Sequence, residues 1–260
     1  MLRKLLKYDL LSVWKSGWGT LPVMAGCAVA ASAAARVINS EYARLSVDSV
    51  NTVSIIVLLI SLFGIIGCGV VIGDLVFVRF SNNFFTDEGY LTFTLPVKRN
   101  TLLLSKTLNA GICLIAYVIL VIACVLVFFT FGNFDFNIYE EIWEFLKGEY
   151  LREGAMLFVY CFEGALVLLS MLFLGISTLH YAITVGSSIS KKERAIASIG
   201  VFFAVSVVTS LIIPDPYGYF WTMNENHAVM LLIYAISIFT PGLVLYFLTL
   251  DRISRKLNLD

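Results

Sequence analysis

Residues 49–73 read SVNTVSIIVLLISLFGIIGCGVVIG, a run of 25 residues between Asp48 and Asp74 that contains no charged side chain. An α-helix rises about 1.5 Å per residue, so about 20 residues cross a hydrocarbon core of roughly 30 Å. The run is therefore long enough for one membrane span. Uncharged segments of this length are typical of transmembrane helices.

Comparable apolar runs recur along the whole chain. Of its 260 residues 59% are hydrophobic and only 14% are charged, which gives more apolar surface than a soluble core of this size can bury. We therefore predict an all-α membrane protein with six transmembrane helices. The predicted spans cover about 18–38, 51–78, 107–131, 154–185, 195–213 and 228–250, together forming a transmembrane domain over 18–250.

The basic residues are distributed unevenly between the two sides of such a bundle. Fourteen of the 18 Lys and Arg residues fall in the amino-terminal segment, the second and fourth loops, and the tail 251–260. Cytoplasmic loops carry the excess of Lys and Arg in membrane proteins. The pattern predicts that both termini, and the loop 79–106, lie in the cytoplasm.

Two segments outside the spans have helical amphipathic patterns. In residues 1–17 leucines recur at helical spacing between the basic residues Arg3, Lys4 and Lys7, which predicts an interfacial helix in the headgroup layer. On the outer side, 135–153 combines acidic residues with an aromatic face. This segment is either a second interfacial helix or a lid at the exit of a translocation path.

The sequence contains no phosphate-binding loop, no zinc-protease motif and no nucleophile elbow. We therefore expect no catalytic residue, no metal site and no cofactor on this chain, and no nucleic-acid partner. Ser177 and His180, three residues apart in the fourth span, leave an intramembrane hydrolase as a remote alternative.

Glu163 lies about ten residues inside the fourth span. A charge at such a position costs about 2.5–3.5 kcal/mol on insertion scales, so the side chain should face the bundle interior, a wet cavity or a partner. It is either a structural carboxyl group or a residue of the substrate path. The second reading makes a proton-coupled secondary transporter the main alternative function.

The loop 79–106 reads RFSNNFFTDEGYLTFTLPVKRNTLLLSK and carries aromatic and acidic residues before Pro96. Aromatic side chains are common anchors at protein interfaces, and acidic residues near a helix start suit the helix dipole. Lys98 and Arg99, which follow the proline, are expected to meet anionic headgroups. The candidate interface residues are Phe84, Phe85, Asp87, Glu88, Gly89, Tyr90 and Phe93.

The stretch EGYLTFTLPV at 88–97, followed by Lys106 before the next apolar run, resembles the permease subunits of type-2 ABC exporters. It is most similar to small six-span permeases of Firmicutes that lack a fused ATPase. The resemblance implies that residues 84–95 include a coupling helix that docks on a separate ATPase.

The same resemblance implies the rest of an export complex in the bacterial cell membrane. Two ATPase subunits would bind ATP and Mg, and a second permease, identical or similar, would complete the path. The implied cargo is an amphipathic or hydrophobic molecule, foremost a peptide of the phenol-soluble modulin kind.

Overall fold

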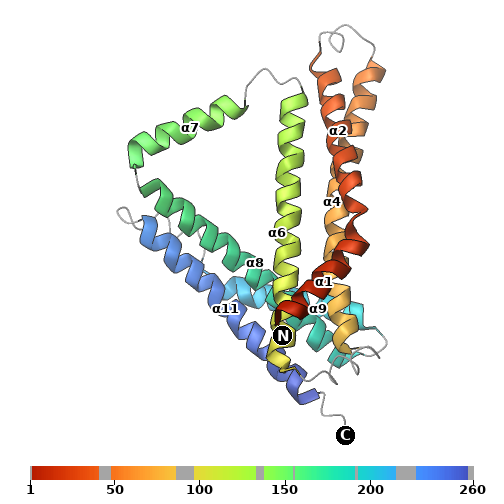
Figure 1. Ribbon diagram of the computed structural model, residues 1–260, viewed down its shortest axis with the longest axis vertical. Coiled ribbons are helices and arrows are strands. Elements are labelled where there is room, and N and C mark those ends of the chain that lie inside the picture. The colour runs from red at the N-terminus through yellow and green to blue at the C-terminus, as the bar shows by residue number, and fades with distance from the viewer. Residues whose placement is uncertain are drawn as a thin grey trace. The chain divides into compact units, whose positions relative to one another are not determined.

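The computed structural model describes residues 2–40, 48–85, 97–132, 138–154, 156–190, 193–214 and 227–256. Within these ranges the regular elements are all α-helices (Figure 1). They are α1 (Leu2–Gly17), α2 (Thr20–Ile38), α4 (Asp48–Phe85), α6 (Arg99–Phe131), α7 (Ile138–Glu153), α8 (Met156–Ile189), α9 (Arg194–Ile212) and α11 (His227–Lys256).

Six helices in the described part of the chain are long and apolar enough to cross a membrane: α2, α4, α6, α8, α9 and α11. The prediction of an all-helical chain with six long apolar segments is confirmed. Their length and hydropathy indicate a multi-pass membrane protein.

Several helices extend beyond the spans expected from the apolar runs. Helix α4 has 38 residues, or about 57 Å at 1.5 Å per residue, and continues through Asp74 and Arg79. Helix α6 begins at Arg99, eight residues before the expected start of the third span. An apolar run predicts only the part of a helix that crosses the hydrocarbon core. The helix itself can continue into polar residues, because its backbone hydrogen bonds do not depend on apolar side chains. Much of the predicted loop 79–106 is therefore helical, and residues 86–96 lie outside the described part.

The chain divides into two compact units. Unit 1 comprises Met1–Lys7, Phe77–Gly111 and Glu153–Asp260, and unit 2 comprises Tyr8–Val76 and Ile112–Arg152. Helices α1, α4 and α6 each contribute residues to both units.

In unit 2, α2 packs with the first part of α4 and the second part of α6 around Met24, Ala28, Cys68 and Cys124. Small side chains let the backbones approach, as is usual where membrane helices pack. The Cys68 thiol donates a weak hydrogen bond to the Thr20 carbonyl at 3.8 Å, and the Cys124 thiol donates one to the Met24 carbonyl at the same distance. Both cysteines thus connect their helices to α2.

In unit 1, α8 packs against α11 and α9 (Figure 1). The contact with α9 is close at Gly186, where an added Cβ would lie 2.6 Å from the Cα of Ser198. The contact with α11 includes Gly242, where a Cβ would lie 3.2 Å from the Cα of Leu174. Glycine at these positions removes the side chain that would hold the helices apart.

Unit 1 has two apolar cores. One is formed by the end of α4, the start of α6 and the end of α11, with Phe80, Phe84, Leu102, Leu103, Tyr246 and Ile253 buried. The other lies between α8 and α11, with Val167, Tyr234, Ala235 and Ile238 buried. Helix α8 contacts both cores, the first through Phe173 and Ile183 and the second through Val167.

Candidate functional site

The candidate interface residues of the loop separate into two groups. Phe84 and Phe85 are the last two residues of α4, whereas Asp87, Glu88, Gly89, Tyr90 and Phe93 lie outside the described residues. Phe84 is only 1% exposed and packs in the core of unit 1, so its side chain stabilises the unit and is not a surface anchor. Phe85 is partly exposed. Of the two candidates that the structure describes, it is the one that a partner could still contact.

An aromatic stack connects this end of α4 to the middle of α8. The His180 ring lies on the Phe80 ring, with centroids 4.0 Å apart and planes inclined by 20°. Phe77 meets His180 edge-on at 5.9 Å, and Phe80 contacts Phe84 at 5.0 Å and Phe85 at 6.2 Å. We call Phe77, Phe80, Phe84, Phe85 and His180 the aromatic stack.

The carboxyl end of α4 is also held by α9. Nη1 of Arg194, the first residue of α9, donates a hydrogen bond to the Phe85 carbonyl at 2.6 Å. The last carbonyls of a helix have no partner within the helix, and a cation there also suits the helix dipole. Phe85, which precedes 86–96, is thus held by two contacts: its ring packs on Phe80 and its carbonyl accepts a hydrogen bond from Arg194.

Ser177 and His180 are each 1% exposed. Among the described residues, neither the Ser177 hydroxyl nor either His180 ring nitrogen has a hydrogen-bond partner. A serine hydrolase needs a hydrogen bond between the nucleophile and its base, and the two side chains do not form one. The described ranges also hold no group of three or more residues that could bind a metal ion.

Glu163 is 6% exposed, and its Oε2 has no hydrogen-bond partner in the described part of the chain. It lies one turn before Val167 on α8, and Val167 packs against Tyr234 of α11. The side chain therefore lies inside unit 1, as a costly carboxyl group in a span should.

A cavity of about 270 Å³ that is open on one side lies between α8, α9 and α11 within unit 1. Its lining is mainly apolar and includes residues of all three helices. The residues are Met171, Leu174, Gly175, Thr178, Phe202, Ser206, Thr209, Ile213, Tyr234 and Ile238. This cavity was not anticipated from the sequence, because it depends on how three separate helices pack.

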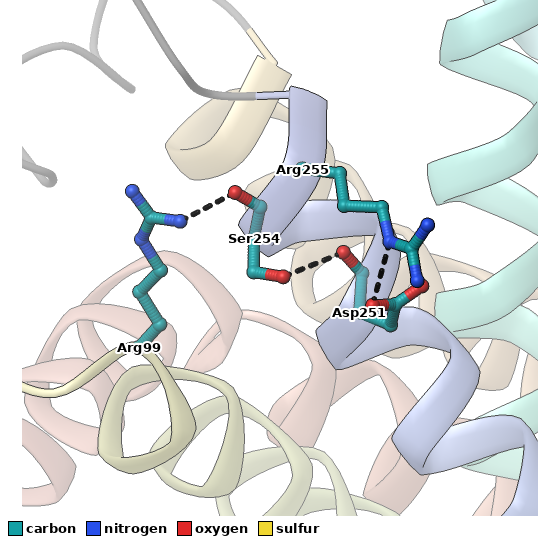
Figure 2. Close-up of polar contacts among 4 residues, drawn as sticks. All are labelled: Arg99, Asp251, Ser254 and Arg255. Atoms are coloured by element: carbon teal, nitrogen blue, oxygen red, sulfur yellow. Dashed lines mark hydrogen bonds and ion pairs between the residues drawn. The ribbon is translucent and has the colours of Figure 1, made fainter.

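The residues predicted at the membrane interface differ in their surroundings. Arg3, Lys4 and Lys7 are exposed on α1, and Lys98 is exposed before α6. Arg99 is partly buried, and its Nη1 donates to the Ser254 carbonyl at 2.6 Å, next to the exposed ion pair between Arg255 and Asp251 (Figure 2). Arg99 thus connects the start of α6 to the end of α11.

Comparison with protein-family models, with curated proteins and with solved structures finds no match. The six long apolar helices of the described ranges indicate the class of a helical multi-pass membrane protein.

Proposed function

We propose that this chain is the membrane-spanning permease subunit of an ATP-driven ABC exporter. The observation that carries the proposal is the EGYLTFTLPV motif at 88–97, which lies in the sequence between the two long helices α4 and α6. Arg194 and the aromatic stack support it, because they hold the end of α4, immediately before this segment, against α9 and α8.

In this proposal the segment 86–96 and both termini lie in the cytoplasm, and the protein resides in the bacterial cell membrane. Helix α1 lies in the headgroup layer, with Arg3, Lys4 and Lys7 toward the anionic surface. Helix α7 lies on the outer side.

The energy comes from a separate ATPase. Two ATPase subunits, each binding ATP and Mg, dock on the coupling segments of two permeases, which are two copies of this chain or this chain with a similar one. The sequence offers no phosphate-binding loop of its own. The cargo is amphipathic or hydrophobic, foremost a peptide.

The contacts at the end of α4 define how such a subunit transmits force. A displacement of 86–96 moves Phe85, whose carbonyl is bound by Arg194 of α9 and whose ring contacts Phe80. Phe80 in turn lies against His180 of α8. Movement at the segment therefore reaches α8 and α9, and α8 also packs along α11.

The proposal is tested by expressing the chain together with an ABC ATPase from the same genome. We expect the two proteins to purify together and to hydrolyse ATP. Phe85→Ala and Glu88→Ala should each weaken assembly or reduce ATP turnover, because aromatic and charged anchors dominate interface energies.

Matched substitutions outside the segment serve as controls. Phe63→Ala removes an exposed phenylalanine from the same helix, and Glu144→Ala removes an exposed acid from α7. Both should leave assembly and turnover intact. If Phe85→Ala and Glu88→Ala behave like these controls, the assignment of the coupling segment is wrong.

A proton-coupled secondary transporter is the second candidate, favoured by the buried Glu163 carboxyl group with an unpaired Oε2 among the described residues. Proton-coupled carriers use buried carboxyl groups in their spans. Transport into inside-out vesicles, with ATP and the ATPase on their outer side and with the proton gradient collapsed, separates the two candidates. Continued transport supports the exporter, and its loss supports the carrier.

A further inference from the structure

The cavity between α8, α9 and α11 has a buried floor and an exposed rim. On the floor, Thr178, Tyr234 and Ile238 are 4%, 9% and 1% exposed. On the rim, Met171 is 45% exposed, and Gly175, one turn further along α8, is also exposed. The cavity therefore opens beside these two residues of α8.

The opening lies near the middle of an apolar helix. Met171 is the sixteenth of the 34 residues of α8, which is one of the helices long and apolar enough to cross a membrane. The hydrocarbon core of a bilayer holds no water that could satisfy polar groups at this depth. A molecule dissolved in the bilayer therefore reaches the cavity from the hydrocarbon.

Two hydroxyl groups of the lining are not used within the described protein. The hydroxyls of Thr178 and Thr209 donate to carbonyl groups of their own helices, at 2.8 Å and 3.0 Å. The hydroxyls of Ser206 on α9 and Tyr234 on α11 have no hydrogen-bond partner among the described residues. Each can both donate and accept. Since an unpaired hydroxyl group in an apolar environment costs free energy, a ligand that bonds to it is favoured.

The cavity also limits the size and the charge of a ligand. Its volume is about 270 Å³, whereas an engineered apolar cavity of about 150 Å³ binds benzene. None of the described residues that line it is charged, and a charge without a partner is costly to bury. The cavity therefore suits a neutral molecule larger than benzene that carries a polar group.

We propose that this cavity binds a neutral aliphatic alcohol from the bilayer. The hydroxyl group of the ligand pairs with Tyr234 and Ser206, and its hydrocarbon chain lies among the apolar residues of the lining. Tyr234 is well placed for this role, because its packing in the core with Val167 and Ile238 holds its ring in position. The site requires no ATPase, so the proposal goes beyond the exporter assignment and does not depend on it.

The site is tested by photolabelling the purified full-length chain in phosphatidylcholine nanodiscs. The probe is an octanol with a diazirine on its chain, and mass spectrometry identifies the labelled peptides. We expect saturable labelling of α8, α9 and α11 around the cavity, which unlabelled octanol reduces. At equal concentrations in the nanodisc lipid, octane should compete about fivefold more weakly, because it lacks the hydroxyl group. Octyl sulfate, which is charged, should not compete.

A second competitor distinguishes two sources of such a hydroxyl group. Diacylglycerol is a neutral lipid with one hydroxyl group, whereas octanol represents a small diffusible alcohol. Competition by diacylglycerol at least as strong as that by octanol would identify the ligand as a lipid. Competition by octanol alone would identify it as a diffusible molecule. Both results support the site.

Three substitutions examine the parts of the site. Tyr234→Phe and Ser206→Ala each remove one hydroxyl group and keep the apolar lining. Each should weaken competition by octanol about fivefold and leave competition by octane unchanged. Gly175→Leu places a side chain at the opening, where a Cβ meets no atom within 4 Å, and should weaken competition by both molecules.

Each substitution has a matched control that does not line the cavity. Tyr8→Phe removes an exposed tyrosine hydroxyl on α1, and Ser210→Ala removes an exposed serine hydroxyl on α9. Gly200→Leu adds a side chain at an exposed position of α9 that also has open space around its Cβ. All three should bind the probe like the original chain.

Three results would overturn the proposal. If octane competes as well as octanol, or if Tyr234→Phe and Ser206→Ala both leave competition by octanol unchanged, the cavity does not recognise a hydroxyl group. If the labelled peptides lie away from the cavity, the probe binds elsewhere. If Gly175→Leu separates associated chains and leaves competition by octanol unchanged, the opening is a contact between two copies. None of these results depends on whether an ATPase assembles with the chain, so the site and the exporter assignment are tested separately.

Discussion

Phe80 offers the sharpest test of how the end of α4 is held. Its side chain is 1% exposed, lies in a core of unit 1 and stacks on His180 at 4.0 Å. Truncating a buried phenylalanine to alanine costs about 3–5 kcal/mol, since apolar contacts are lost and a cavity remains. We expect Phe80→Ala to lower the free energy of unfolding by that amount.

The stacking contribution can be separated by a double-mutant cycle. Aromatic pairs add about 0.5–1.5 kcal/mol beyond the area that they bury. The double mutant Phe80→Ala/His180→Ala should therefore lose about 1 kcal/mol less unfolding free energy than the sum of the losses in the two single mutants. A coupling energy of zero would refute the reasoning that the two rings act as one contact.

The assay is reversible unfolding in mixed micelles, followed by far-ultraviolet circular dichroism and tryptophan fluorescence. Phe63→Ala is the control, because Phe63 is on the same helix and 68% exposed, so its loss should cost under about 1 kcal/mol. Equal losses for Phe80→Ala and Phe63→Ala would show that the burial assigned to Phe80 is wrong.

The remaining predictions compare paired positions or test a single contact. Ser177→Ala removes a buried hydroxyl without a described partner and should raise the free energy of unfolding by about 1 kcal/mol. Ser105→Ala removes a hydroxyl that donates to a backbone carbonyl at 2.8 Å and should lower the free energy of unfolding by about 1 kcal/mol. A lower free energy of unfolding for Ser177→Ala in the same assay would show that its hydroxyl is hydrogen-bonded. Gly186→Ala should cost about 1–3 kcal/mol because its Cβ would overlap α9. Gly164 has open space around its Cβ position, so Gly164→Ala should raise the free energy of unfolding by up to about 1 kcal/mol through helix propensity. A lower melting temperature for Gly164→Ala than for Gly186→Ala would contradict the close contact of Gly186 with α9. Arg194→Gln removes a charged hydrogen bond worth about 1.5–3 kcal/mol at the end of α4, so ATP turnover with the partner should fall, and unchanged turnover would show that this contact takes no part in coupling.

The membrane-crossing helices were predictable because a single physical requirement determines them. A span must be long and uncharged, and residues 49–73 show this without any knowledge of tertiary contacts. The helix ends were less predictable, because polar residues outside the hydrocarbon core can form either a helix or a loop. In the structure α4 continues to Phe85 and α6 starts at Arg99.

The candidate site was predictable only in part. The burial of Glu163 follows from the cost of a charge in a span, and the structure places it inside unit 1. The burial of Phe84 was not foreseen, because a phenylalanine beside a polar loop serves a core or an interface equally well. His180 was considered only with Ser177, and its stacking on Phe80 depends on a long-range contact that no local pattern contains.

The length of α4 has a consequence for access. Even tilted by 40°, about the largest usual angle, a helix of 57 Å covers about 44 Å along the membrane normal, roughly 14 Å more than the hydrocarbon core. Its polar residues lie toward both ends, from Asp48 to Ser54 at the start and from Asp74 to Asn83 near the carboxyl end. In the proposed topology this end extends past the lipid together with the ends of α6 and α11 that pack on it. Water-soluble proteases, and maleimide reagents acting on a cysteine introduced into 86–96, should therefore reach this segment in proteoliposomes, and a bound partner should shield it.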